Sequence, residues 1–140
     1  MRPLLENKQI ICHNLKFDWK VAHIYDINVN CVYDTMLALG VTKRYEEETY
    51  ALGLKDLTKN IFGRDSFELS DFVMGGSFGD SEIAFWDLPY ELVRQYAPAD
   101  TDNTYALYEF IEKADILNKY DAKKVFEMEI TFAKAVAYSE

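Results

Sequence analysis

Acidic side chains follow the apolar runs of this sequence at points where they could share a metal ion. Asp18 comes four residues after Asn14, just beyond the apolar run at residues 9–13. In "YAPAD", Tyr96 precedes Asp100 by four residues, which on a helix puts the phenol and the carboxylate on one face, about one turn apart. A carboxylate that binds Mg²⁺ or Mn²⁺, beside a tyrosine hydroxyl that orients a metal-bound water, is an arrangement suited to hydrolysis.

The other acidic residues and the two histidines have simpler interpretations. We interpret Asp34, Asp56 and Asp102 as helix caps and structural partners, because an Asp after a strand most often accepts backbone N–H groups at the start of a helix. His13 and His23 have no convergent ligands in the sequence, so we interpret them as packed or surface histidines rather than as zinc ligands.

Composition indicates one soluble globular domain. The chain has 140 residues, of which 49% are hydrophobic and 15% aromatic, enough for a packed core. A net charge of −9 normally argues against nucleic-acid binding. Acidic residues can, however, bind divalent cations, which make the local electrostatic potential positive where they sit. Cys12 and Cys31 lie in apolar runs without metal-type spacing, which indicates buried thiols in a reducing cytoplasm. We find no signal peptide and no apolar run of the roughly 20 residues that a membrane span needs.

Hydrophobic patterning predicts alternating strands and helices in the first part of the chain. Residues 9–15 are predicted to form a buried strand of a mixed or parallel sheet, followed by a helix. Residues 29–39 are predicted to begin as a strand and to become helical after Asp34. This alternation favours an α/β architecture. The apolar residues at helical spacing in the first helix are Phe17, Val21, Ile24 and Tyr25.

The second part of the chain is predicted to be mainly helical. Residues 44–63 contain an amphipathic helix ended by Gly63, and residues 63–81 are mixed, with a mobile Gly- and Ser-rich loop at 74–81. Residues 86–96 open a helix with Asp87 near its N-cap and Pro89 in its first turn. Three helix faces are predicted. The amphipathic helix before Gly63 carries Leu54, Leu57 and Ile61 on one face. A long helix from about residue 99 carries Ala99, Asn103, Ala106, Leu107, Phe110 and Ala114, and a last helix buries Val125, Met128, Phe132 and Val136.

Four segments, "HNLKFD", "VYDTMLA", "LGLKDLTKNIFG" and "YAPADTDNTYALYEF", resemble in order and spacing the 3′–5′ proofreading exonuclease domain of family-A DNA polymerases, the DNA polymerase I family. The resemblance runs from about residue 4 to residue 115. Asn14, Phe17 and Asp18 match one exonuclease motif of the family, and Tyr96 and Asp100 match its Y-x-x-x-D motif.

The resemblance implies an α/β, ribonuclease-H-like (DnaQ-like exonuclease) fold that lacks its first strands and has a helix-rich C-terminal half. Residues 1–118 would be a partial exonuclease domain, and residues 119–140 a helix leading toward a polymerase domain. The implied reaction is hydrolysis of single-stranded DNA at its 3′ end with two Mg²⁺ or Mn²⁺ ions. In it Asp18 and Asp100 bind metal, Tyr96 positions the attacking water, and Asn14, Leu15 and Phe17 contact the substrate or support the terminal-base pocket.

The sequence departs from the family pattern in two places. The family's D-x-E motif, which supplies two further metal ligands, is absent from residues 1–9. Hard cations want several oxygen ligands, so we expect this chain alone to have little or no nuclease activity. Pro98 stands inside the Y-x-x-x-D motif, and a new helix starting there would displace the Tyr96 ring from the face that carries Asp100.

Three interpretations remain open. The first is an exonuclease-type domain, active or formerly so, from a polymerase of bacterial or phage character. The second is a non-catalytic module, in which the same fold remnant makes protein contacts, holding the polymerase domain, or binds single-stranded DNA without cutting it. In either case the incomplete sheet would expose an edge for a missing N-terminal segment or a second copy. The third is an α/β domain with a chance motif, which predicts that Asp18 and Asp100 lie far apart.

Overall fold

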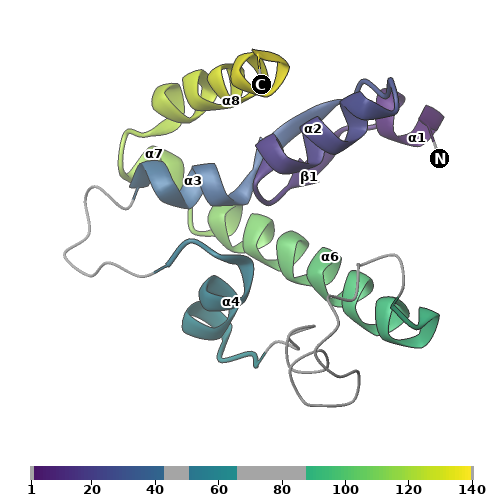
Figure 1. Ribbon diagram of the computed structural model, residues 1–140. Coiled ribbons are helices and arrows are strands. Elements are labelled where there is room, and N and C mark those ends of the chain that lie inside the picture. Colours follow the sequence, from purple (N-terminus) through teal and green to yellow (C-terminus); the bar gives the residue numbers. More distant parts are fainter. Residues whose placement is uncertain (1, 43–50, 66–87, 140) are drawn as a thin grey trace.

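The computed structural model describes residues 2–42, 51–65 and 88–139, in which helices surround a small parallel sheet (Figure 1). The α/β class and the helix-rich C-terminal half are as predicted. In chain order the elements are α1 (Arg2–Asn7), β1 (Ile10–Cys12), α2 (Leu15–Ile24), β2 (Cys31–Asp34), α3 (Thr35–Thr42), α4 (Leu54–Phe62), α6 (Tyr90–Lys113), α7 (Ile116–Lys119) and α8 (Lys123–Ser139).

The two strands are parallel and are joined by α2. Parallel neighbours need a crossover connection, and the ten-residue helix supplies it. Ile10 pairs with Cys31 and, after an irregularity in the register, Cys12 pairs with Asp34. The carboxyl ends of both strands therefore lie side by side, and the residues that follow them, His13 and Thr35, are in contact through their side chains.

One edge of β1 has no strand partner among the described residues, where the sheet has the order β1–β2. The N–H of Ile10 donates to the carbonyl of Asn30 on the β2 side, at 2.9 Å. Helix α6 packs against β1 without supplying a strand ladder.

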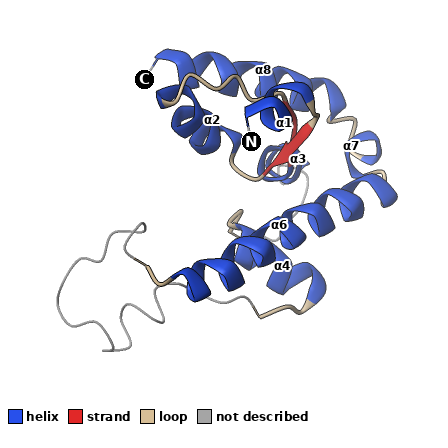
Figure 2. Cartoon of the chain, turned by 90° about the vertical axis from the view of Figure 1, so that its right-hand side faces the viewer, coloured by secondary structure: helices blue, strands red, loops and turns tan. Residues whose placement is uncertain are grey.

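The helices form two layers with the sheet between them (Figures 1 and 2). Helix α8 lies along α2 on one side, and α6 lies on the other side with α4 packed on it. Helix α3 touches both α6 and α8. The core that joins the layers consists of Cys12, Leu15, Trp19, Val29, Cys31, Ala38, Leu39, Val41, Leu57, Leu107, Ile111, Leu117, Ala122, Phe126, Ile130 and Ala137. Both cysteines are free and buried, as predicted.

Helix α4 ends as its sequence predicts. Gly63 takes the left-handed conformation, with φ of 65°, and its N–H donates to the Lys59 carbonyl at 2.9 Å. Leu57 is fully buried on this helix.

Helix α6 is continuous from Tyr90 to Lys113, with Pro98 inside it. No new helix starts at Pro98, so Tyr96 and Asp100 belong to one helix. Pro98 removes one N–H donor, but packing of α6 on β1, α3 and α4 outweighs the missing hydrogen bond. Pro89 is the N-cap residue of α6 rather than part of its first turn.

The predicted apolar face of α8 is wrong. Met128 is 71% exposed, Phe132 is 65% exposed and Val125 is also exposed, while Phe126 and Ile130 face the core. Helix α8 is apolar on two faces, and it is the Phe126 face that packs against α2, α3 and β2.

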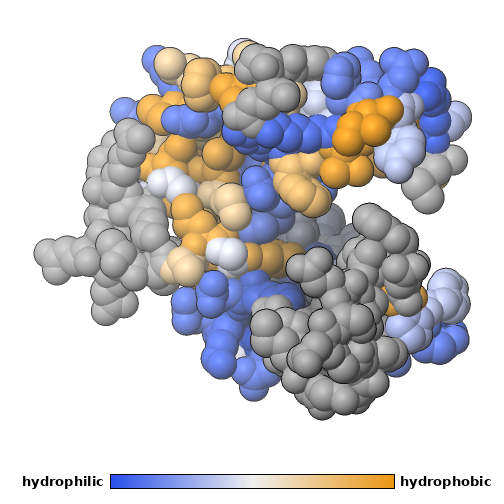
Figure 3. Space-filling view, viewed as in Figure 1, coloured by the Kyte–Doolittle hydropathy of each residue, from blue (hydrophilic) through white to orange (hydrophobic). Residues whose placement is uncertain are grey.

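Helix α2 is likewise apolar on two faces. Leu15 and Trp19 are its buried residues, whereas all four apolar residues predicted at helical spacing are exposed: Phe17, Val21, Ile24 and Tyr25. Figure 3 shows hydrophobic surface on the layer that contains α2.

Several predictions lie wholly or partly outside the described residues: residues 44–50 of the segment with the amphipathic helix, residues 66–81 of the mixed segment with its loop at 74–81, and the cap at Asp87. In the parts of the chain that are described, every helix is too short or too polar to cross a lipid bilayer.

Candidate active site

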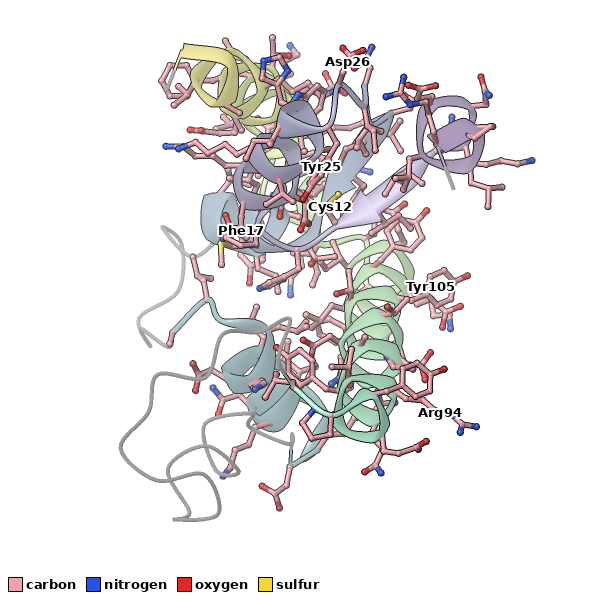
Figure 4. The ribbon with its side chains drawn as sticks, turned by 45° about the vertical axis from the view of Figure 1, so that its right-hand side comes forward. Cys12, Phe17, Tyr25, Asp26, Arg94 and Tyr105 are labelled. Atoms are coloured by element: carbon pink, nitrogen blue, oxygen red, sulfur yellow. The ribbon has the colours of Figure 1, made fainter. Side chains whose placement is uncertain are left out.

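A pocket of about 790 Å³ opens at the carboxyl end of β1, between α2 and α6. The surface is hollowed between the layer that contains α2 and the layer that contains α6 (Figure 3), and Figure 4 shows Cys12, Phe17 and Tyr105 around this region. Its lining comprises Gln9, Ile10, Ile11, Cys12, His13, Asn14, Phe17, Asp18, Met36, Gly53, Leu54, Tyr96, Asp100, Thr101, Thr104 and Tyr105. The pocket thus brings Asp18 together with Tyr96 and Asp100 from the far end of the chain.

Helix α6 supplies the second half of the site. Tyr96 and Asp100 are four residues apart on a continuous helix, so both side chains project from one face, about one turn apart. Thr104, a further turn along this face, donates its hydroxyl to the Asp100 carbonyl at 2.9 Å. The Lys55 ammonium of α4 lies 5.1 Å from the centre of the Tyr96 ring, a cation–π contact that helps to fix the orientation of the ring.

The buried carboxylate of Asp34 holds both strand-to-helix junctions. At the start of α3 it accepts the N–H groups of Met36 at 2.8 Å and Leu37 at 3.2 Å, the cap that the sequence predicts. It also accepts the N–H groups of Asn14 at 3.2 Å and Leu15 at 2.6 Å, at the start of α2. One carboxylate that is 1% exposed therefore fixes the turn that carries Asn14 and Asp18.

Asp18 lies in the first turn of α2, where the helix dipole favours a negative charge. Burial nevertheless raises the pKa of the Asp18 carboxyl, and the nearby Asp34 carboxylate raises it further. A cation in the pocket would relieve both effects. Asn14, which precedes α2, takes the left-handed conformation with φ of 69°, a region that Asn enters more readily than most residues.

His13 links the end of β1 to the segment before α4. Its Nε2 donates to the carbonyl of Leu52 at 3.0 Å, so in the neutral ring Nδ1 accepts from the Thr35 hydroxyl at 2.8 Å. Burial lowers the pKa of His13. This is a packed histidine, as predicted, with both ring nitrogens engaged.

The predicted substrate residues occupy different environments. Asn14 and Phe17 line the pocket, and Phe17 is 64% exposed, so its ring is available for stacking. Leu15 is fully buried and does not line the pocket, so it can only pack under the residues that form the pocket. Tyr105 and Thr104 were not predicted from the sequence, although Thr104 follows Asp100 at the same four-residue spacing that singled out Tyr96.

The residues in this pocket suit a hard divalent cation. Two carboxylates, two amides and two phenols line it, and oxygen donors of this kind are what Mg²⁺ and Mn²⁺ bind. Within residues 2–42, 51–65 and 88–139, no three His, Cys, Asp or Glu side chains are close enough to hold a metal ion by themselves.

Comparison of the sequence with known proteins identifies a nuclease family. Residues 1–114 match a family described as 3′–5′ exonuclease. DNA polymerase I of Treponema pallidum (strain Nichols) is 28% identical over 123 residues, which cover 83% of this chain but 11% of the relative. The chain thus spans about a tenth of that protein's length. No solved structure gives a significant match. The chain belongs to the 3′–5′ exonuclease domain family of the family-A DNA polymerases.

Proposed function

We propose that this chain forms part of a two-metal 3′–5′ exonuclease site, with a ribonuclease-H-like (DnaQ-like) architecture, that hydrolyses the 3′ end of single-stranded DNA. The observation that carries the proposal is the shared pocket: Asp18 and Asp100, eighty-two positions apart in sequence, line it together with Tyr96. The chance-motif interpretation predicts the opposite, two carboxylates in separate parts of the fold.

The family resemblance gives each residue a proposed role, and the position of each residue at the pocket supports it. Asp18 and Asp100 would hold Mg²⁺ or Mn²⁺, and such ions, when bound, stabilise the charge on the attacking and leaving oxygens. The Tyr96 hydroxyl orients the attacking water. Phe17 stacks on the terminal base, and Asn14 donates to the substrate strand.

We propose that the 140-residue chain alone cleaves DNA weakly or not at all. Two carboxylates are too few to hold a pair of hard cations in fixed geometry. The open edge of β1 borders the pocket, since Gln9, Ile10 and Ile11 line it, and a further strand paired there would place its side chains beside Asp18. We assign that position to a carboxylate-bearing segment of a longer polymerase. A second copy of this chain pairing through the same edge is the competing occupant.

Residues 119–140 are proposed to lead toward a polymerase domain, in a DNA polymerase I-like protein of the bacterial or phage cytoplasm. Helix α8 supports this proposal because its outer face exposes Met128 and Phe132 beside a shallow hollow that also includes Thr131 and Ala135. Such a face on a helix already packed on its other side is typical of contact with another domain.

The alternative function is a non-catalytic module that binds single-stranded DNA without cutting it. The specific observation in its favour is the exposed ring of Phe17 at the pocket, which can stack on a base whether or not a metal ion is bound. Metal binding and cleavage, measured separately, distinguish the two functions.

The test combines Mn²⁺ titration with degradation of 3′-labelled single-stranded DNA, on the wild-type chain and on Asp18→Ala, Asp100→Ala and Asp102→Ala. We expect weak Mn²⁺ binding that either pocket variant abolishes and that Asp102→Ala retains, with little nucleotide release. Unchanged Mn²⁺ binding in Asp18→Ala would refute the site. Robust nucleotide release that Asp18→Ala abolishes would keep the site and overturn the expected inactivity.

A further inference from the structure

A second pocket adjoins the candidate active site on the α4 side of α6. It has a volume of about 430 Å³ and is lined by Arg64, Asp65, Tyr96, Ala99, Asp100, Asp102 and Asn103. Tyr96 and Asp100 border both pockets. Among the described residues that line either pocket, Arg64 is the single Arg or Lys, in a region otherwise dominated by carboxylates.

The Arg64 side chain is held in place from two sides. Its Nη1 donates to Oδ1 of Asn103 at 3.1 Å, and Asn103 is only 8% exposed. Its guanidinium carbon lies 5.2 Å from the centre of the Phe62 ring, which itself packs edge-on against Phe110. The residue directly follows the Gly63 cap of α4, so the backbone that carries it is also fixed. The guanidinium is therefore oriented before any ligand arrives.

Among the described residues, a single side chain, Asn103, accepts a hydrogen bond from the Arg64 guanidinium. A guanidinium has five N–H donors, and in the described contacts Asn103 accepts from one of them. Asp65, the nearest carboxylate in sequence, is paired instead with Lys59, at 3.3 Å. An exposed, pre-oriented guanidinium with free donors suits a phosphate, whose oxygens accept two parallel N–H bonds.

The position of Asn103 on α6 sets the distance between Arg64 and Asp100 along the helix. Asn103, which orients Arg64, is three residues beyond Asp100 and hence about 4.5 Å further along the helix axis, at a rise of about 1.5 Å per residue. The Arg64 guanidinium is therefore held beside the stretch of α6 that carries Asp100, and both residues line the second pocket.

We propose that Arg64 binds a backbone phosphate of the single-stranded DNA that enters this site, with Asn103 and Phe62 as its positioning residues. This inference rests on the proposed function and adds the anion-binding group that the carboxylate pocket itself lacks. The competing role is purely structural: Arg64 would only fasten α4 to α6 through Asn103.

Salt dependence separates the two roles. Binding of a fluorescent oligothymidylate to the chain is measured in EDTA over a series of salt concentrations, for wild type, Arg64→Gln, Arg64→Lys and the matched control Arg94→Gln. Arg94 is paired with Glu91 at 3.8 Å, lines neither pocket and points away from α4 (Figure 4).

We expect Arg64→Gln to bind about tenfold more weakly at low salt, a loss of about 1.4 kcal/mol, with the slope of log K against log salt reduced by about 0.7, the value for one phosphate contact to a single strand. Arg64→Lys should keep the slope and lose part of the affinity, because lysine keeps the positive charge but lacks the paired N–H donors of the planar guanidinium. Arg94→Gln should match wild type. Thermal unfolding of each variant checks that the fold is intact.

Three results would overturn the inference: an unchanged slope in Arg64→Gln, an equal loss in Arg94→Gln, or no oligothymidylate binding by the wild-type chain at the lowest salt. The same assay on Asp18→Asn and Asp100→Asn, without metal, should show tighter binding because each change removes a negative charge. Because EDTA removes the cations, a failure in this assay leaves the proposed nuclease site standing, and the Mn²⁺ titration tests that site separately.

Discussion

Replacing Asp34 by Ala should destabilise the protein more than replacing any exposed carboxylate. The Asp34 side chain is buried and accepts four backbone N–H groups from the starts of two helices. Loss of an N-cap acceptor costs about 0.5–2 kcal/mol per helix, and N–H groups left buried without a partner add to this. We expect a loss of about 3–4 kcal/mol, a large part of the roughly 5–15 kcal/mol typical of a domain, and a Tm lower by about 10 °C.

Asp34→Asn provides a graded comparison. Its single amide oxygen can replace Oδ1, which accepts three of the four N–H groups, but the amide nitrogen would face the Leu15 N–H that donates to Oδ2 at 2.6 Å. We expect about half the loss of Asp34→Ala. Urea unfolding followed by circular dichroism measures both variants, with the exposed Asp102→Ala as control. A loss in Asp34→Ala no greater than that in Asp102→Ala would refute the assigned role.

Three further predictions concern stability. Because burial lowers the pKa of His13, the folded state binds this proton less readily than the unfolded state, so stability should fall as pH decreases through about 6.5, and a series of Tm against pH should be flatter in His13→Gln. Met128→Glu and Phe132→Glu should change the unfolding free energy by less than about 0.5 kcal/mol in urea unfolding, since both side chains are exposed; a large loss would mean that this face of α8 packs against the core. Leu107→Ala, at a fully buried position, should cost about 2–5 kcal/mol in urea unfolding, whereas the exposed Phe17→Ala should cost little; equal effects would contradict the assigned core.

Local signals in the sequence were enough to predict most elements. The apolar run before Asn14, the cap at Asp34 and the stop at Gly63 are each read from a few neighbouring residues, and β1, α3 and α4 begin or end accordingly. The family motifs placed Asp18 and Asp100 in one site, and the structure brings them to one pocket.

Helix faces could not be predicted in the same way. Helix α8 carries Val125, Met128 and Phe132 at one helical spacing and Phe126 and Ile130 at another, so periodicity alone cannot decide which set meets the core. The decision depends on α2 and α3, which are more than eighty residues earlier in the chain.

Non-local contacts account for the other differences. A proline inside a helix tends to break it, but α6 packs on β1, α3, α4 and α7 and stays continuous through Pro98. Asp34 caps α3 as predicted, yet its bond to Leu15 joins residues nineteen positions apart, which no local pattern reveals. Arg64 belongs to no motif that the sequence analysis identified, and its hydrogen bond to Asn103 depends on how α4 packs on α6.

The central claim is that Asp18 and Asp100 share one divalent cation in the pocket at the end of β1. Paramagnetic broadening of amide NMR signals by substoichiometric Mn²⁺ tests it most directly, on wild type and on Asp18→Asn and Asp100→Asn. We predict that Mn²⁺ broadens the signals of pocket residues such as His13 and Thr104, and that either substitution removes this effect. Broadening that survives one of the two substitutions, or that centres away from the pocket, would contradict a shared site.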